Sequence, residues 1–270
     1  MPLLSQDNKM SSLVVVGTGI KFASHLTTEA KIYIQQSNKV LYLVNDPAMK
    51  EWLQKNNPNS ESLDEVYSRY FLRIHCYRAI KNYILDNLYK NQHVCVVLYG
   101  HPAVFSQPAL AAVHQAKREG YYAKILPGIS AEDCLFADLL VDPGSHGCQS
   151  FEATDFLIRR RQVDFSCHLI LWQVGVIGVL NHPKEAHDNT KGAKLLFDYL
   201  NNYYDSKHKV TLYEAALYPH FEPTIERIML KQLPKQKFSA ISTLYIPPIH
   251  QASCDEEMLK ALGINIADLQ

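Results

Sequence analysis

Short apolar runs recur along the first half of the chain, and each ends in a turn. Residues 13–17 read Leu-Val-Val-Val-Gly, which is typical of a strand buried on both faces of a parallel sheet. The same texture returns at residues 39–44, 94–99 and 123–126. Between these runs lie stretches that favour helices, at residues 28–36, 63–89 and 108–119. The alternation predicts an α/β fold with a mainly parallel sheet, in which ligands bind beyond the carboxyl ends of the strands.

The pattern changes after Pro127 and Gly128. Residues 129–140 predict one helix, and a loop rich in glycine and proline follows it. Separated strand-like runs come next, at residues 168–174, 210–213, 224–230 and 241–246. Residues 256–262 predict a short amphipathic helix that docks on the body of the protein or on a partner. We therefore expect three parts, namely an N-terminal α/β lobe (1–126), a C-terminal α/β lobe (127–250) and a helical tail (251–270).

Composition and charge argue against several functional classes. The 27 basic and 27 acidic residues cancel, so the net charge indicates no attraction to nucleic acid or an anionic membrane. No segment approaches the roughly 20 apolar residues of a spanning helix, and no secretion signal is evident, so we expect a cytoplasmic protein. The six scattered cysteines form no CxxC pair, which favours buried free thiols in a reducing compartment. Without an HExxH motif or a cluster of Cys and His, we expect no metal site.

Glycine turns after the predicted strands are candidates for a ligand site. Gly17-Thr18-Gly19 lacks the third glycine of a dinucleotide fingerprint, because Phe22 stands at that position, so a nicotinamide or flavin site is not expected. Residues 99–105 read Tyr-Gly-His-Pro-Ala-Val-Phe, and their glycine allows a ligand to approach the backbone. His101 in this turn can equally be a packed histidine. Ser130 stands where a helix begins, either as a cap or as a ligand contact.

Taken in order, several segments resemble the tetrapyrrole (corrin/porphyrin) methylase superfamily. They are the GTG and GHP turns, PGISAED at 127–133, QSFEA at 149–153, LWQ at 171–173 and ISTLYIPP at 241–248. Within that superfamily, His101 together with the QSFEA and LWQ segments is similar to the borosin enzymes, which methylate backbone amide nitrogens. The resemblance covers nearly the whole chain.

This resemblance implies a two-lobed class III methyltransferase that binds S-adenosylmethionine in the cleft between the lobes and releases S-adenosylhomocysteine. The implied cofactor contacts are Gly17, Tyr99, His101, Val104, Phe105, Ser130, Ala131, Gln173, Ser242 and Thr243. Tyr99 and Val104 would cover the adenine, while polar groups at the strand ends would hold the ribose and the carboxylate.

Methyl transfer to an amide nitrogen needs more than orientation of the donor. The nitrogen lone pair is delocalised into the carbonyl, so the site needs a base and a group that stabilises the developing charge on oxygen. Arg73 and Tyr77 are four residues apart, which on a helix places the guanidinium near the phenol and would lower the tyrosine pKa. The resemblance implies Tyr67, Arg73 and Tyr77 as catalytic residues, with Tyr77 as base, Arg73 as its activator and Tyr67 as a second donor. Tyr70 is an alternative for the role of Tyr67.

The implied substrate is a ribosomally made precursor peptide. In fused borosins the peptide is an extension of the enzyme, whereas this sequence stops at Gln270, so we expect a separate precursor that binds in trans to a homodimer, or a heterotetramer with two precursors. Arg159-Arg160-Arg161 is interpreted as a solvated or precursor-contacting loop. Two alternatives stay open, a methyltransferase of the same fold that acts on a corrin or porphyrin precursor, and a non-catalytic binding module.

Overall fold

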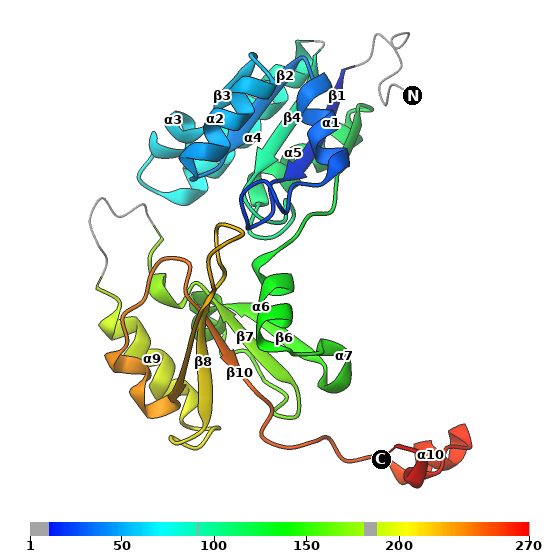
Figure 1. The fold of residues 1–270 in the computed structure, drawn as a ribbon, viewed down its shortest axis with the longest axis vertical. Helices are drawn as coiled ribbons and strands as arrows, with labels where there is room; N and C mark the ends of the chain where they lie inside the picture. The colour runs from blue at the N-terminus through cyan, green and yellow to red at the C-terminus, as the bar shows by residue number, and fades with distance from the viewer. Residues whose placement is uncertain (1–10, 91, 181–187, 270) are drawn as a thin grey trace. The chain divides into compact units, whose positions relative to one another are not determined.

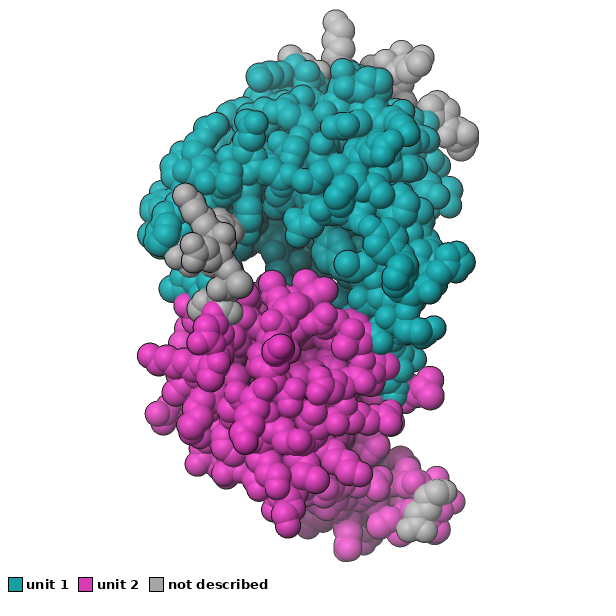
Figure 2. Space-filling view, turned by 60° about the vertical axis from the view of Figure 1, so that its left-hand side comes forward, with its two compact units in different colours: residues 1–139, 179–186, 215–223 teal, residues 140–178, 187–214, 224–270 magenta. Residues whose placement is uncertain are grey.

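A computed structural model describes residues 11–90, 92–180 and 188–269, and its contacts divide the chain into two compact units. Unit 1 is Met1–Leu139, Val179–Ala186 and Ala215–Pro223, and unit 2 is Leu140–Gly178, His187–Glu214 and Thr224–Gln270 (Figures 1 and 2). By contacts, the helix that ends at Leu139 is therefore part of the first unit. Within the described part of the chain, no helix combines the length and apolarity needed to cross a membrane.

Unit 1 is built on a five-stranded sheet whose pairs are all parallel, with the order β3-β2-β4-β1-β5 (Figure 1). Its strands are β1 (Ser12–Gly17), β2 (Lys39–Leu43), β3 (Ser60–Ser62), β4 (His93–Leu98) and β5 (Tyr122–Ile125). At the centre, Val15 lies opposite Val96 on one side and Ile125 on the other. The α/β prediction and the four apolar strands are confirmed, while the polar β3 had no signal in the hydrophobic pattern.

Helices cover both faces of this sheet. They are α1 (Thr28–Gln36), α2 (Pro47–Asn56), α3 (Asp64–Ser68), α4 (Arg73–Tyr89) and α5 (Gln107–Arg118). The further helix of unit 1 is α6 (Ala131–Leu139). Alternate β1 side chains point to opposite faces, so Val15 packs in a core with α4 and α5, whereas Val16 packs in a core with α1 and α2. The prediction of a single helix over residues 63–89 was wrong, because Leu72 adopts an extended backbone (φ −90°, ψ 130°) that separates α3 from α4.

Unit 2 contains a mixed five-stranded sheet with the order β6-β7-β10-β8-β9 (Figure 1). Its strands are β6 (Cys148–Glu152), β7 (His168–Trp172), β8 (Lys209–Glu214), β9 (Thr224–Met229) and β10 (Thr243–Ile246). β6 runs parallel to β7, and the remaining neighbours are antiparallel. The four strand-like runs of this half of the chain are confirmed, and the short β6 extends the sheet.

The remaining elements of unit 2 are short apart from one helix. They are α7 (Pro143–His146), α8 (Ala153–Ile158), α9 (Thr190–Leu200), α10 (Glu256–Leu262) and the 3₁₀ turns η1 (Val174–Val176), η2 (Leu230–Lys235) and η3 (Ile266–Leu269). Phe156 of α8 and Leu196 of α9 are fully buried against the sheet. The predicted tail helix forms as α10, and almost all of its residues are exposed.

Candidate functional site

Three glycine turns converge in unit 1 at the carboxyl edge of the parallel sheet. Gly17 ends β1, Gly100 follows β4 and Gly128 follows β5. A Cβ atom on Gly17 would lie 2.1 Å from the carbonyl oxygen of Gly100 and 2.8 Å from Cδ of Pro102. No side chain fits there without displacing the neighbouring turn, so the glycine is required by close packing of backbone on backbone. We call these three turns the glycine cradle.

Hydrogen bonds fix two of the turns to each other. Gly19 and Gly100 form an isolated antiparallel bridge, in which the Gly19 N–H donates to the Gly100 carbonyl at 3.2 Å and the Gly100 N–H donates to the Gly19 carbonyl at 3.1 Å. The N–H of Thr18 donates to the Leu98 carbonyl at 2.8 Å. The cradle is therefore a rigid surface at which a ligand can approach the main chain closely.

Apolar side chains of the second turn stand open to solvent beside the cradle. Tyr99, Val104 and Phe105 expose 38%, 45% and 53% of their surface. Phe105 also has φ 52°, a left-handed conformation that costs about 1–3 kcal/mol in a residue other than glycine and that often marks functional sites. Burial of its hydroxyl, with a smaller contribution from Cys134, raises the pKa of Tyr99 to about 12, so this phenol stays protonated at neutral pH. These apolar side chains are thus exposed, and their contact with an adenine stays a prediction.

His101 and Ser130 both have structural partners. Nδ1 of His101 accepts from the N–H of Ala103 at 3.1 Å, which stabilises the turn. The Ser130 hydroxyl donates to the carboxylate of Asp133 at 2.7 Å and accepts from the Asp133 N–H at 3.2 Å, so it caps α6, which begins at Ala131. The simpler roles that the sequence allowed for His101 and Ser130 are therefore present, and their ligand contacts stay predictions.

In unit 2, the predicted cofactor residues lie around the end of β7. Gln173 directly follows this strand with φ 59°, a second strained position among the predicted contacts. Ser242 and Thr243 are almost completely buried. The Ser242 hydroxyl donates to the Glu214 carboxylate at 2.5 Å and accepts from the N–H of Ser239 at 2.8 Å. Of the three predicted residues, Gln173 alone is more than marginally exposed. The Ser242 carbonyl accepts from the N–H of Val174 at 3.1 Å, which ties it to the residue after Gln173.

Sequence reasoning missed two residues that hold this turn in place. A Cβ atom on Gly175 would lie 1.8 Å from the carbonyl oxygen of Ser239, so glycine is required for the turn after Gln173. Glu214, at the end of β8, accepts hydrogen bonds from Ser239 and Ser242. A lone glycine and a lone glutamate carry no periodic or motif signal, so only the fold brings them together.

Tyr67 and Tyr77, the two tyrosines proposed for catalysis, lie side by side in unit 1. Their ring centroids are 6.5 Å apart and the planes are inclined by 22°. On one continuous helix, ten residues would separate them by about 15 Å along the axis. The break between α3 and α4 therefore creates the pair, because it lets α3 pack against the first turns of α4.

Arg73 is the first residue of α4, and one of its side-chain nitrogens is available for a hydrogen bond. Its Nε is buried and has no hydrogen-bond partner among the described residues. The positive charge of Arg73 acts on Tyr67, where it opposes the rise in pKa that burial and Tyr77 cause, and the pKa of Tyr67 is about 12. No side chain caps the start of α4, where the N–H of Arg73 donates to the Leu180 carbonyl at 3.4 Å and the N–H of His75 to the Leu72 carbonyl at 3.0 Å. The helix dipole adds partial positive charge at the same point. This corner of unit 1 is suited to an oxygen that carries negative charge.

Tyr70 lies apart from the tyrosine pair. Its ring is 6.3 Å from that of His75, and its carbonyl accepts a hydrogen bond from the thiol of Cys76 at 3.2 Å. Of the two alternatives that the sequence left open, Tyr67 is therefore the one that contacts Tyr77. The catalytic roles themselves stay predictions.

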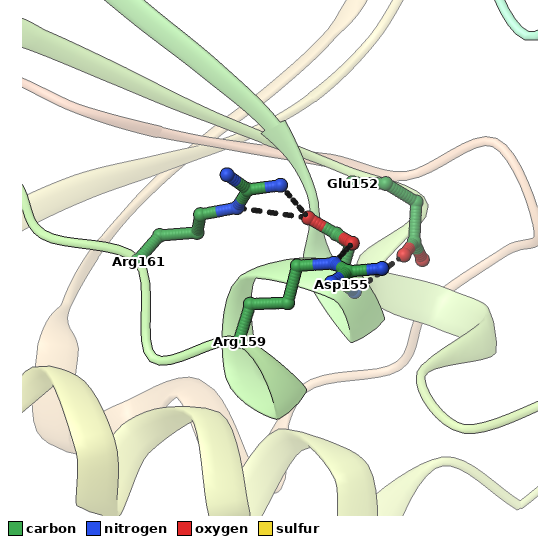
Figure 3. Close-up of polar contacts among 4 residues, drawn as sticks. All are labelled: Glu152, Asp155, Arg159 and Arg161. Atoms are coloured by element: carbon green, nitrogen blue, oxygen red, sulfur yellow. Dashed lines mark hydrogen bonds and ion pairs between the residues drawn. The ribbon is translucent and has the colours of Figure 1, made fainter.

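The three consecutive arginines follow α8, and an acidic residue binds two of them (Figure 3). The Asp155 carboxylate accepts from Nε of Arg159 at 2.6 Å and from the guanidinium of Arg161 at 2.8 and 3.0 Å. Glu152 caps the same helix by accepting from the Asp155 N–H at 2.7 Å. These pairings lower the pKa of Asp155. Two of the three guanidiniums thus share one carboxylate, and the run keeps a net positive charge.

Comparison with known families decides where this chain belongs. Residues 12–227 match the model of the tetrapyrrole (corrin/porphyrin) methylases, which is more than half of the chain. The chain belongs to this family. Solved structures agree on the fold of this methylase. The uroporphyrin-III-C-methyltransferase of Thermus thermophilus has a TM-score of 0.63 at 15% identity, covering 88% of this chain and 92% of that one. Diphthine synthase has a TM-score of 0.61 at 15% identity, covering 90% and 92%.

Curated relatives with much higher identity are borosin proteins. A methyltransferase/ribosomally synthesized cyclic peptide gymnopeptides precursor of Gymnopus fusipes is 40% identical over 98% of this methylase and 64% of the relative. The omphalotin A precursor protein of Omphalotus olearius is 38% identical, covering 96% and 63%. A type I borosin cyclic peptide precursor of Coprinopsis marcescibilis is 38% identical, covering 96% and 68%. The chain thus spans slightly less than two thirds of the first relatives that it matches.

Proposed function

We propose that this methylase transfers methyl groups from S-adenosylmethionine to backbone amide nitrogens of a ribosomally made peptide. The observation that carries the proposal is the cluster of Tyr67, Arg73 and Tyr77, which supplies a base, a donor and a positive charge in one corner of unit 1. The names of the relatives, which join a methyltransferase to a cyclic peptide precursor, support a peptide as the acceptor.

The residues present fit the cofactor. The glycine cradle allows close approach to the main chain, and the exposed Tyr99, Val104 and Phe105 offer an apolar surface for a purine. We assign the further contacts to Gln173, Ser242 and Thr243. When bound, S-adenosylmethionine supplies an already activated methyl group and leaves as S-adenosylhomocysteine.

The chain's own residues have to make an amide nitrogen nucleophilic. Tyr77 accepts the proton of the amide, because its ring lies beside that of Tyr67 and it follows Arg73 by about one turn of α4. The Arg73 guanidinium, whose buried Nε has no hydrogen-bond partner among the described residues, stabilises the charge that moves to the carbonyl oxygen. Tyr67 keeps its proton at neutral pH, since its pKa is about 12, and therefore acts as a donor. The two tyrosines thus take different roles in this proposal, Tyr77 as the base and Tyr67 as a hydrogen-bond donor.

The first experiment tests the reaction. Purified protein is incubated with S-adenosylmethionine and an apolar peptide, and tandem mass spectrometry locates any gain of a methylene group on backbone or side chain. The peptide is offered both as a separate chain and as a fusion to residue 270. Methylation in either form supports backbone N-methylation. Methylation of the separate peptide also supports a precursor bound in trans, and methylation of the fusion alone rejects that part. A tetrapyrrole acceptor tests the alternative substrate class.

The second experiment tests the base. Tyr77→Phe should bind the cofactor normally and lose methyl transfer by about a hundredfold or more, which is the usual contribution of a general base. Tyr70→Phe is the matched control, because Tyr70 is a neighbouring tyrosine that contacts His75 instead, and it should keep the rate. Full activity of Tyr77→Phe would reject the assignment. We also propose that the protein forms a homodimer, or a heterotetramer with two precursors. Sedimentation of the purified protein tests the homodimer, and sedimentation of its mixture with a precursor tests the heterotetramer.

A further inference from the structure

The loop between β1 and α1 closes around one imidazole. The N–H groups of Ile20 and Lys21 both donate to Nδ1 of His25, at 3.3 and 3.2 Å. The N–H of His25 in turn donates to the carbonyl of Lys21 at 3.2 Å. A single ring nitrogen thus serves as the acceptor for two main-chain donors, and the loop from Gly19 to His25 is built around it.

This imidazole supports one side of the glycine cradle. A Cβ atom on Gly19 would lie only 2.1 Å from Cβ of His25, so the two residues are in the closest possible contact. Gly19 is also the residue that exchanges two hydrogen bonds with Gly100. His25 therefore fixes the position of Gly19, and Gly19 fixes the turn that follows β4.

The hydrogen bonds require one protonation state. A neutral imidazole with its proton on Nε2 can accept at Nδ1, whereas an imidazolium carries a proton on both nitrogens and accepts nothing. Protonation would set the N–H of Nδ1 against the N–H groups of Ile20 and Lys21 and leave both amides without a partner. The closed loop and the charged ring exclude each other.

The charges that face His25 have both signs. Burial disfavours the imidazolium, and Lys21 in the same loop does so as well, while Asp133 and Asp138 on α6 favour it. Burial is the largest contribution, and the pKa of His25 is lowered from its ordinary value of 6.5. Since the native loop prefers the neutral ring, its closure is complete above that value and is lost as the pH falls below it.

We infer that His25 is a positioning residue: it holds the loop from Gly19 to His25 closed when its ring is neutral and releases this loop when the ring is protonated. Its effect on the cofactor rests on the function proposed above, whereas its effect on the loop does not. The expected consequence is that the methylase loses affinity for its methyl donor in mildly acidic solution without unfolding.

The test begins with hydrogen exchange of the protein without any cofactor. Protection factors of the Ile20 and Lys21 amides are measured between about pH 7.5 and about pH 5.5. Because the closed loop admits only the neutral ring, the ratio of closed to open loop, and with it the protection factor, should fall by up to about tenfold per pH unit below the ordinary histidine value. Protection of Val15 in β1 reports whether the sheet itself stays folded. Constant protection of Ile20 and Lys21 across this range would overturn the inference.

Two variants separate titration of His25 from general acid effects. His25→Asn places an oxygen acceptor where Nδ1 lies and cannot be protonated in this range, so its loop protection should not change with pH. His114→Gln, which removes an exposed histidine from α5, should keep the pH response of the parent protein. A response that persists in His25→Asn would show that another group titrates, and the inference would be wrong.

Calorimetry connects the loop to the ligand. S-adenosylmethionine should bind about tenfold more weakly to the parent protein at about pH 5.5 than at about pH 7.5, and with unchanged affinity to His25→Asn. Equal affinity of the parent protein at both values, with a loop that opens, would overturn the positioning role. Absence of binding at every pH would instead contradict the proposed function, and the exchange data would still decide the behaviour of the loop.

Discussion

Two buried tyrosines of unit 2 should respond in opposite ways to loss of the hydroxyl group. Tyr204 and Tyr245 expose 2% and 7% of their surface, and burial raises the pKa of each to about 12. The Tyr245 hydroxyl forms a hydrogen bond with Nδ1 of His168 at 2.8 Å. The Tyr204 hydroxyl has no hydrogen-bond partner among the described residues. The pair therefore isolates the value of the hydrogen bond from that of burial.

The magnitudes follow from this difference. A buried hydroxyl without a partner costs roughly 1–3 kcal/mol, and removing it forfeits only a few dispersion contacts of about 0.1–0.2 kcal/mol each, so Tyr204→Phe should raise the free energy of unfolding by about 1 kcal/mol. Tyr245→Phe leaves the histidine nitrogen unpaired and should lower it by about 1–2 kcal/mol. Urea unfolding followed by circular dichroism measures both, and both report on the same unit. Destabilisation of similar size in the two variants would refute the reasoning, because it would require a partner for Tyr204.

Three further outcomes are expected. Gly17→Ala places a methyl group 2.1 Å from the Gly100 carbonyl oxygen, so it should destabilise unit 1 by about 1–3 kcal/mol or more in urea unfolding and abolish donor uptake in calorimetry. Burial and the nearby His146 lower the pKa of His168, so the native state prefers the neutral ring. The stability of the protein should therefore be retained above about pH 6.5, and the urea midpoint should fall as the pH drops below that value. Asp155→Asn removes two exposed ion pairs and should change the free energy of unfolding by no more than about 1 kcal/mol.

Much of the fold was predictable because buried parallel strands produce continuous apolar runs. Both β1 and β4 are almost completely buried, and each was predicted within one residue of its ends. The polar strands β3 and β6 were not predicted, for the same reason. Their place in a sheet comes from pairing with β2 and β7 and not from an apolar run of their own. Hydrophobic patterns therefore predict apolar strands better than polar ones.

For the candidate site, the helix that carries Arg73 and Tyr77 was predictable, and the geometry was not. The spacing of Arg73 and Tyr77 placed both on one helix, and both lie on α4. The proximity of Tyr67 and Tyr77 depends on the break at Leu72, where no proline or glycine signals it, so tertiary packing overrides local propensity. His25 shows the same limit, because only the folded loop shows that one ring nitrogen accepts two main-chain donors.

The order of strands in unit 2 has a consequence for synthesis of the protein. β10 lies at the middle of its sheet, between β7 and β8, although it is the last of the five strands along the chain. Until the ribosome has released residue 246, β7 and β8 each present an unpaired edge of apolar strand, which is the kind of surface that recruits other chains. Nascent chains stalled before this point should therefore aggregate or bind chaperones, and the second sheet can close only after β10 has left the ribosome.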